Sequence, residues 1–211
     1  MRSAPESWRT VEVPADRLDG WLGRFEARHG AVRDSRDDEA VTLTAADGAV
    51  ARVHLPCAPS PGDSDDLVEA AAAFGSFGLV LVRRGGFAVG RVEQGSLEAS
   101  RCGTRYVQGK TKAGGWSQQR FARRRANQAD AVAQAAAGAV SAVLGRIATT
   151  LVCGGDRTLL RQTLELSGAD GWPVVRWLDV PDPRRQVLID AIPRARAARI
   201  DLNSAARSLG S

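Results

Sequence analysis

The first half of the chain alternates short hydrophobic runs with turn-forming residues. Hydrophobic positions recur at helical spacing over residues 18–27, where Asp16 is the expected N-cap. Residues 41–44 and 50–55 flank an Asp-Gly turn, which predicts a β-hairpin. A Pro/Ser/Asp-rich segment then leads to a short helix expected over residues 67–74.

The second half alternates strands with helices. Three strands separated by tight turns form a predicted meander over residues 78–83, 87–92 and 97–107. After a long helix, the pattern predicts a strand, a helix, a strand and a helix over residues 147–152, 157–166, 174–178 and 183–199, the last kinked or interrupted at Pro193. This alternation favours parallel pairings within a mixed β-sheet flanked by helices, so the expected fold class is α/β (α+β).

The long helix, expected over residues 118–144, is amphipathic. Arg120, Arg124 and Asn127 fall on one side, where we expect them to face solvent, and Ser117 is the expected N-cap. Small or branched residues recur every three or four positions on the other side, which would pack closely on a sheet. These inward positions are Ala122, Ala126, Ala129, Ala133, Ala136, Val140, Val143 and Ile147.

At 211 residues, the chain can bury one substantial core with short appendages. We therefore expect residues 1–66 to form an N-terminal helix and β-hairpin extension packed on a main domain of residues 67–211. No apolar run is long enough to span a bilayer, so no membrane association is expected. The 3 cysteines are far apart and form no Cys-x-x-Cys pair, which argues against a zinc site or a disulfide framework and favours the cytoplasm.

Positive charge is concentrated in one segment of the sequence. No acidic residue lies between Glu98 and Asp130, a stretch that includes both lysines of the chain and six arginines. The chain carries a net charge of +5, so the remainder sums to 5 − 8 = −3. A basic segment of this kind is typical of a surface that binds a polyanion such as RNA.

A glycine pair comes directly before the long helix. Gly114 and Gly115 restrict the backbone little, and amide side chains and the free N–H groups of a helix amino end follow them. Hydrolysis of an ester by water needs donors for the developing oxyanion and a group that holds the water. The segment therefore suits the hydrolysis of an ester within an RNA environment.

The segment Gly114-Gly115-x-Ser117-x-x-Arg120-Phe121-Ala122-Arg123-x-Arg125 resembles the catalytic segment of archaeal and eukaryotic class I peptide-chain release factors. In those proteins a Gly-Gly-Gln-Ser tip precedes Arg-Phe-Ala-Arg-x-Arg at the same spacing. Here Trp116 occupies the place of the glutamine. Gly115-Trp116-Ser117-Gln118 instead resembles the Gly-x-x-Gln tip of the Vms-like release-factor family, which includes actinobacterial-type members.

This resemblance implies a release-factor catalytic domain with an RNase-H-like sheet and a tip loop over residues 108–118. It implies a peptidyl-tRNA hydrolase that releases nascent chains from stalled ribosomes. Gln118 would coordinate the attacking water, with Gln119 as the alternative, and Gly114 and Gly115 would shape the tip. The residues expected to bind RNA are Lys110, Lys112, Trp116, Arg120, Arg123, Arg124 and Arg125. The implied partners are peptidyl-tRNA and the peptidyl transferase centre of the large ribosomal subunit, for a monomer without metal or cofactor.

Two other functions fit parts of the pattern. A non-catalytic ribosome- or RNA-binding module would need only the basic helix face. A nuclease on an RNase-H-like sheet would need converging carboxylates, and none is visible near the basic segment. The acidic run from Asp34 to Glu39 lacks the ligand spacing of a calcium loop and is expected to be a solvated loop. Asp156 is expected to cap the following helix, and Cys153 to be buried.

Overall fold

A computed structural model describes residues 7–56, 66–104, 115–145 and 150–207, with backbone only for residues 115–126. Contacts divide the chain into two units, Met1–Phe74 with Arg196–Ser211, and Gly75–Ala195. We call these the first and the second unit. The sequence had suggested a single boundary at residue 66. In the structure, the C-terminal segment from Arg196 belongs instead to the same unit as the N-terminal segment.

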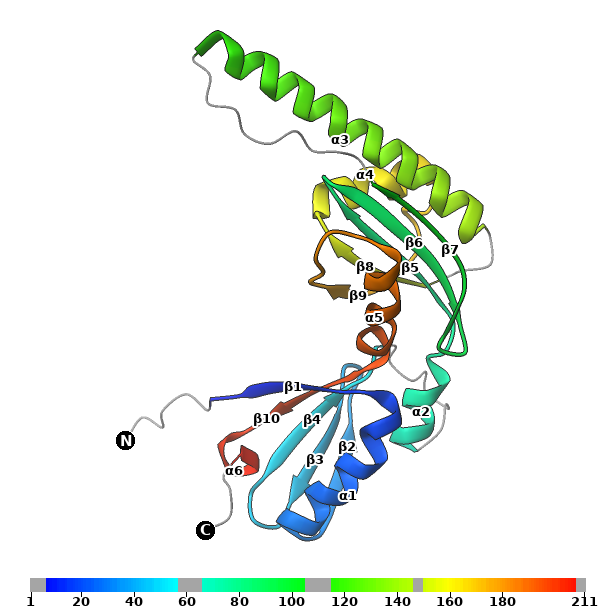
Figure 1. Ribbon diagram of the computed structural model, residues 1–211. Helices are drawn as coiled ribbons and strands as arrows, with labels where there is room; N and C mark the ends of the chain where they lie inside the picture. The colour runs from blue at the N-terminus through cyan, green and yellow to red at the C-terminus, as the bar shows by residue number, and fades with distance from the viewer. Residues whose placement is uncertain (1–6, 57–65, 105–114, 146–149, 208–211) are drawn as a thin grey trace. The chain divides into compact units, whose positions relative to one another are not determined.

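The first unit is built on an antiparallel five-stranded sheet (Figure 1). Its strands, in spatial order, are β1 (Arg9–Val13), β10 (Ala198–Leu202), β4 (Val50–His54), β3 (Val41–Ala45) and β2 (Val32–Arg36). The predicted hairpin is confirmed as β3 and β4. The predicted C-terminal helix over residues 183–199 was too long, because β10 begins at Ala198 and inserts between β1 and β4.

One face of this sheet carries the core of the first unit. Leu18 and Phe25 of α1 (Leu18–His29) pack with Val53 and Ile200 of the sheet. The short helices η1 (Ala15–Arg17), α2 (Leu67–Ala73) and α6 (Ser204–Arg207) complete the unit. Asp16 does not cap α1 as expected, because it lies inside η1 and Arg17 occupies the N-cap position.

The second unit contains a mixed five-stranded sheet, as the alternation of elements predicted. Its order is β7 (Ser96–Thr104), β6 (Gly86–Glu93), β5 (Phe77–Arg83), β8 (Leu151–Gly155) and β9 (Val174–Leu178). Strands β7, β6 and β5 form the predicted antiparallel meander, whereas β5, β8 and β9 are parallel. The α/β fold class is therefore confirmed.

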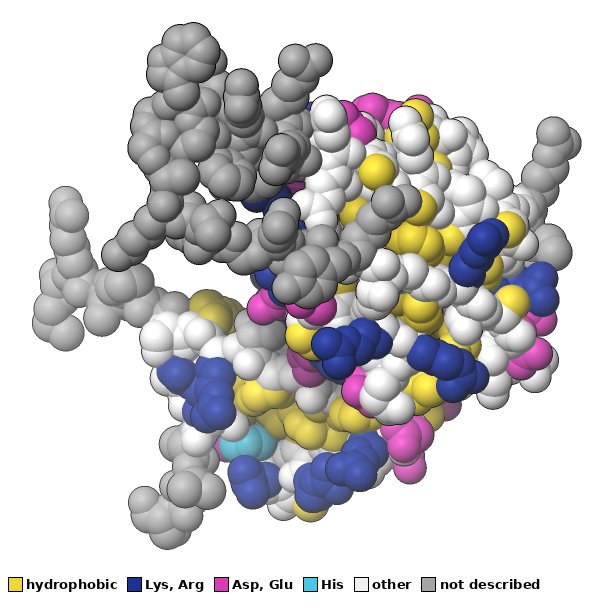
Figure 2. All heavy atoms as spheres, turned by 45° about the horizontal axis from the view of Figure 1, so that its top comes forward, with side chains coloured by type: hydrophobic (Ala, Val, Ile, Leu, Met, Phe, Trp, Pro, Cys, Tyr) yellow, Lys and Arg dark blue, Asp and Glu magenta, His cyan; other side chains and the backbone are white. Residues whose placement is uncertain are grey.

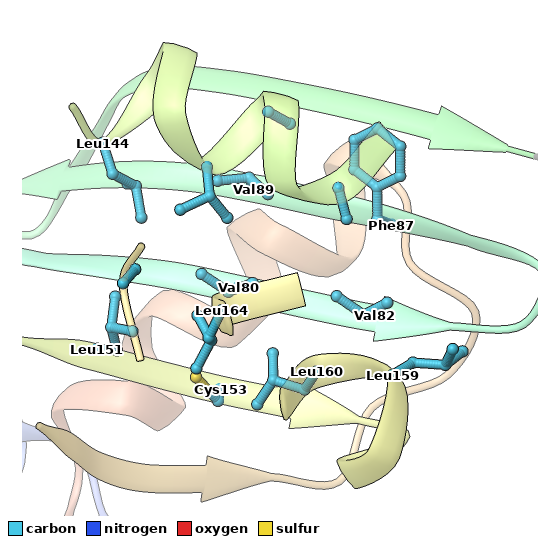
Figure 3. Close-up of a cluster of buried hydrophobic side chains, with 14 of the residues drawn as sticks. Val80, Val82, Phe87, Val89, Leu144, Leu151, Cys153, Leu159, Leu160 and Leu164 are labelled. Carbon is cyan, nitrogen blue, oxygen red and sulfur yellow. The ribbon is translucent and has the colours of Figure 1, made fainter. Parts of the chain in front are cut away.

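Helices cover both faces of this second sheet. Helices α3 (Gly115–Val143) and α4 (Arg157–Ser167) pack on the face that carries Val80, Val82 and Val89 (Figure 3). The opposite face includes Gly90, where an added Cβ would lie 3.5 Å from Leu188 of α5 (Arg185–Arg196). Pro193 lies inside α5 and does not end it. The unit therefore has three layers, with the sheet between α3 and α4 on one side and α5 on the other.

Candidate active site and nucleic-acid interface

The carboxyl end of β7 and the amino end of α3 hold the two ends of the glycine-rich segment. Thr104, the last described residue of β7, pairs with Gly86 at the start of β6. Gly86 has φ 155°, and an added Cβ would lie 2.3 Å from the carbonyl oxygen of Gly103. Because only glycine allows this approach, the end of β7 is held against β6. The chain therefore leaves the sheet beside the β5–β6 turn.

The carboxyl-terminal half of α3 anchors the helix on the sheet. Val132, Ala136 and Val140 are buried in the core, as is Leu144 directly after the helix. An added Cβ at Gly78, near the start of β5, would lie 2.8 Å from Leu144 Cδ1. Leu144 lies near the amino end of β5, whereas β7 ends near the carboxyl end of β5. The amino end of α3 therefore points toward the edge of the sheet where β7 ends. Figure 1 shows its amino-terminal half continuing beyond the sheet.

The buried side of α3 agrees with the sequence prediction. Ala133, Ala136 and Val140 are buried as expected, and Ala129 and Val143 are partly buried against the same core. Asn127, the one residue of the predicted outer row whose side chain is described, is exposed. Ile147 lies outside the described residues. The inward register of the helix is therefore the predicted one from residue 129 onward.

The structure places the predicted site residues in two groups. Gly114, Lys110 and Lys112 lie outside the described residues. Gly115 is the first residue of α3, so Ser117 lies inside the first turn and is not the N-cap that was expected. The remaining predicted residues follow in the first three turns, where the backbone alone is described: Trp116, Gln118, Gln119, Arg120, Arg123, Arg124 and Arg125.

Helix geometry brings these backbone positions together. From Gly115 to Arg125 an α-helix rises about 15 Å, so every predicted residue after Gly115 lies within that distance of the helix end. The first backbone N–H groups of a helix have no intrahelical acceptor, and they carry about half a positive elementary charge. The amino end of α3 therefore combines hydrogen-bond donors with a basic sequence, which suits the stabilisation of an oxyanion or a phosphate.

A hollow that sequence reasoning missed lies at the carboxyl ends of the parallel strands. It measures about 470 Å³ and is lined by Arg83, Arg84, Gly85, Gly155, Asp156 and Asp182. Gly85 directly precedes Gly86, the partner of Thr104, so the hollow lies at the base of the glycine-rich segment. Open α/β sheets bind ligands at this edge. The sequence does not predict it as one site, because the lining residues come from three separate turns.

Asp156 caps α4 at the edge of this hollow. Its Oδ1 accepts hydrogen bonds from the backbone N–H groups of Thr158 and Leu159, at 3.0 and 3.2 Å. The predicted capping role is therefore confirmed. Arg84 Nε lies 3.9 Å from the other carboxylate oxygen of Asp156, and Arg83 donates to the carbonyl oxygen of Val180 at 2.7 Å. These contacts fix turns that lie at the same edge of the sheet as the end of β7, where the glycine-rich segment begins.

Two further sequence predictions concern residues away from this edge. Cys153 is buried, and burial raises the pKa of its thiol to about 12, so it stays protonated as the expected packing residue. Asp37 accepts the backbone N–H groups of Glu39 and Ala40, each at 2.8 Å, and lies 3.5 Å from Arg52. The acidic run is therefore not wholly the expected loop, because Asp34 lies in the exposed edge strand β2 and only Asp37 to Glu39 lie in a hydrogen-bonded turn after it. Among the described residues, no three His, Cys, Asp or Glu side chains are grouped so that they could hold a metal ion.

The charges of the described residues are mixed over the face seen in Figure 2. Basic, acidic and hydrophobic side chains all occur on that face. The acid-free run of eight positive charges lies between Glu98 and Asp130 in the sequence, around the start of α3. No described helix is both long enough and apolar enough to cross a membrane.

A comparison with known protein families identifies the second unit of the chain. The family model described as Actinobacteria/chloroflexi VLRF1 release factor matches residues 75–201. The match begins at the first residue of the second unit and includes β5 to β9, the glycine-rich segment and all of α3. No curated protein matches the chain.

Proposed function

Because the chain belongs to the Actinobacteria/chloroflexi VLRF1 release factor family, we propose that it hydrolyses the ester bond of peptidyl-tRNA and so releases nascent chains from stalled ribosomes in the cytoplasm. The observation that carries this proposal is the position of Gly115-Trp116-Ser117-Gln118 at the amino end of α3. The anchored carboxyl half of that helix would present the tip to a substrate beyond the edge of the sheet (Figure 1).

The chemistry requires a positioned water and a stabilised oxyanion. The oxygen of water attacks the ester carbonyl carbon, and the bond from that carbon to the ribose oxygen breaks. The peptide leaves as a carboxylic acid, while a proton from water passes to the ribose oxygen. In this proposal the Gln118 amide holds the water, and backbone N–H groups at the start of α3 donate to the oxyanion. Gly114 and Gly115 allow the backbone to approach the ester without a side-chain clash.

The basic residues of the same segment would hold the RNA. Phosphate contacts position a protein on nucleic acid without reading its sequence, which suits a factor that acts on stalled ribosomes independently of a codon. Trp116 lies beside the tip in the sequence and could stack on a nucleobase. The six cations assigned to RNA are Lys110, Lys112, Arg120, Arg123, Arg124 and Arg125.

The test measures release of labelled peptide from peptidyl-tRNA bound to purified large ribosomal subunits. Gln118→Ala should lower the rate about 100-fold or more, because a misplaced water loses most of its reactivity. Gln119→Ala is the matched control, since it removes the same amide one residue further along the helix. Ribosome affinity should stay within about twofold in both variants.

The two glutamine variants also separate the alternatives. Loss of release in Gln119→Ala alone would move the catalytic role to the neighbouring residue. Unchanged release in both variants would overturn the tip assignment. Salt-sensitive ribosome binding without any release by the unmodified protein would favour a non-catalytic RNA-binding module.

A further inference from the structure

Helix α1 of the first unit carries a basic face that no described residue neutralises. Arg17, Trp21, Arg24 and Arg28 are spaced by four, three and four residues, so they lie on one side of the helix. Arg17 directly precedes α1, and all three arginines are exposed. Within the described part of the chain, none of the three guanidinium groups has an ion-pair or hydrogen-bond partner. We call these four residues the α1 face.

A shallow hollow borders the α1 face. It measures about 140 Å³ and is lined by Trp21, Arg24, Phe25, Arg28 and His29 of α1, with Leu202 and Ala206 from β10 and α6. All of these residues belong to the first unit. The hollow thus has an aromatic wall, and two arginines stand at its rim.

The aromatic wall has a fixed geometry. The rings of Trp21 and Phe25 are stacked, with centroids 5.4 Å apart and planes at 16°. Phe25 in turn contacts His29, with ring centroids 4.8 Å apart. His29 Nδ1 lies 2.8 Å from the carboxylate of Asp47, which fixes the imidazole at the end of the row. Trp21 is the outermost ring of the three, partly buried against the core of the first unit and partly exposed.

The acidic residues of α1 lie on its other side. Asp19 and Glu26 are separated by seven residues, so they share a face with each other. Each is two residues from a member of the α1 face, and residues two apart on a helix do not face each other. The positive charge of Arg17, Arg24 and Arg28 is therefore not screened by the carboxylates of the same helix.

We propose that the α1 face is a second RNA-binding surface, which takes a single-stranded segment with phosphates on Arg24 and Arg28 and a base on Trp21. The argument is charge complementarity together with a partly exposed ring, the combination that binds single-stranded nucleic acid. Arg24 and Arg28 are one helical turn apart, about 6 Å along the axis, so they can contact different phosphates of one strand. An acidic peptide would use the arginines but would bring no base to stack on the partly exposed ring of Trp21.

The α1 face lies outside the matched family region, since all four of its residues precede residue 75. It goes beyond the proposed hydrolase function and does not depend on it. A second RNA contact in the first unit would give the chain two separate points of attachment to a ribosomal particle. That arrangement raises affinity through effective concentration, without any change at the tip.

The test compares binding of the full chain to a labelled single-stranded RNA oligonucleotide over a range of salt concentrations. The double variant Arg24→Ala/Arg28→Ala should weaken binding. It should also reduce the steepness with which the logarithm of the binding constant falls with the logarithm of the salt concentration (the salt slope) by about 1.4, since each single-strand phosphate contact contributes about 0.7. The matched control is Arg9→Ala/Arg33→Ala, which removes two exposed arginines from the strands of the same unit. The control variant should have nearly the same salt slope as the unmodified protein.

Trp21 provides an independent measurement. Trp21→Ala should weaken binding by about tenfold, as loss of one stacked base does, and Trp21→Phe should restore most of the affinity because it keeps a ring. Unchanged affinity in the Arg24→Ala/Arg28→Ala variant would overturn the proposal, and so would an equal loss in the control. Binding of a Glu-rich peptide that depends on Arg24 and Arg28, with unchanged RNA binding, would assign the surface to an acidic protein partner.

The outcome can be separated from that of the hydrolase proposal. The Arg24→Ala/Arg28→Ala variant should still release peptide from free peptidyl-tRNA at saturating substrate, whereas Gln118→Ala should keep its RNA affinity and lose release. A variant that lost both properties would overturn the assignment of separate surfaces.

Discussion

At the scale of single residues, the second sheet depends on glycines that admit no side chain. Gly155 ends β8 with φ 100°, and an added Cβ would lie 2.1 Å from the carbonyl oxygen of Val82. Gly168 ends α4 with φ 70°, but nothing lies within 4 Å of its added Cβ. Both positions thus have a positive φ, which would strain a residue that carries a side chain. They differ in the space that a side chain would find there.

This difference gives a matched pair of stability measurements. Gly168→Ala should lower the free energy of unfolding by about 1 kcal/mol, the cost of the left-handed conformation for alanine. Gly155→Ala should lower it by about 3 kcal/mol, because backbone displacement adds to the same strain. Urea denaturation of both variants measures the difference. Equal losses would show that β5 and β8 can separate at this point without cost.

Of two helix caps predicted at aspartate residues, the one at Asp156 is confirmed and the one at Asp16 is wrong. Asp156 follows a glycine pair after a buried strand, and it caps α4 as expected. Asp16 has an equally suitable side chain, but the chain already turns helically at Ala15, which places the aspartate inside η1. The sequence shows which side chains are able to cap a helix. The path of the preceding backbone determines whether such a side chain reaches the cap position.

At the scale of elements, the sequence predicted those with a clear hydrophobic period. The hairpin, the meander, β9 and the helices α1 to α4 were expected close to their observed bounds. Strand β2 was not, because its five residues, Val-Arg-Asp-Ser-Arg, are polar at an edge of the sheet and mostly exposed. Strand β10 was missed because its pairing with β1 and β4 joins positions at least 199 − 54 = 145 residues apart, which no local pattern records.

Helix α3 makes a prediction that belongs to the element as a whole. Its carboxyl half is fixed in the core, so substitutions in the amino half should change RNA binding and leave the fold intact. Arg124→Ala should weaken binding to large ribosomal subunits and lower the salt slope by about 0.7 to 0.9. Arg161→Ala is the control, because this exposed arginine of α4 lies 3.8 Å from Glu165 and is already partly neutralised.

The thermal unfolding midpoint of the Arg124→Ala variant should match that of the unmodified protein. A lowered midpoint would place Arg124 in a packing contact and remove it from the RNA-binding row. A salt slope equal to that of the control would show that the outer row of α3 does not contact phosphates.

At the scale of the whole molecule, the two units differ in their expected response to acid. Three described carboxyl groups have a pKa below the usual 3.8, and all lie in the first unit: Asp37, Asp47 and Asp201. The backbone N–H of Glu39, followed by that of Ala40, lowers the pKa of Asp37. For Asp47 the backbone N–H of Ala49 is the main cause, followed by the hydrogen bond with His29.

Asp201 lies on the polar face of the first sheet. Burial alone would raise its pKa, but the Thr10 hydroxyl, which donates to Asp201 at 2.5 Å, and the charges of His54 and Arg199 outweigh that effect. Asp201 also lies 3.0 Å from His54 Nε2, so it links β1, β10 and β4 across the sheet. Protonation of this carboxyl group would therefore weaken contacts among three strands at once.

The sign of the pH effect follows from the direction of these shifts. A carboxyl group with a lowered pKa in the folded state stabilises the fold above pH 3.8, and this contribution is lost as the pH falls through the folded-state pKa. The first unit should therefore lose protection against amide hydrogen exchange as the pH falls below about 4, before the second unit does.

Asp201→Asn should make the first unit less stable at pH 6 and less dependent on pH below 4. Asp34→Asn, which removes a carboxylate 3.9 Å from Arg36 on the edge strand β2, is the control for the loss of one surface charge. Simultaneous loss of protection in both units would show that they unfold as one cooperative structure, and the two-unit description would then hold for contacts but not for stability.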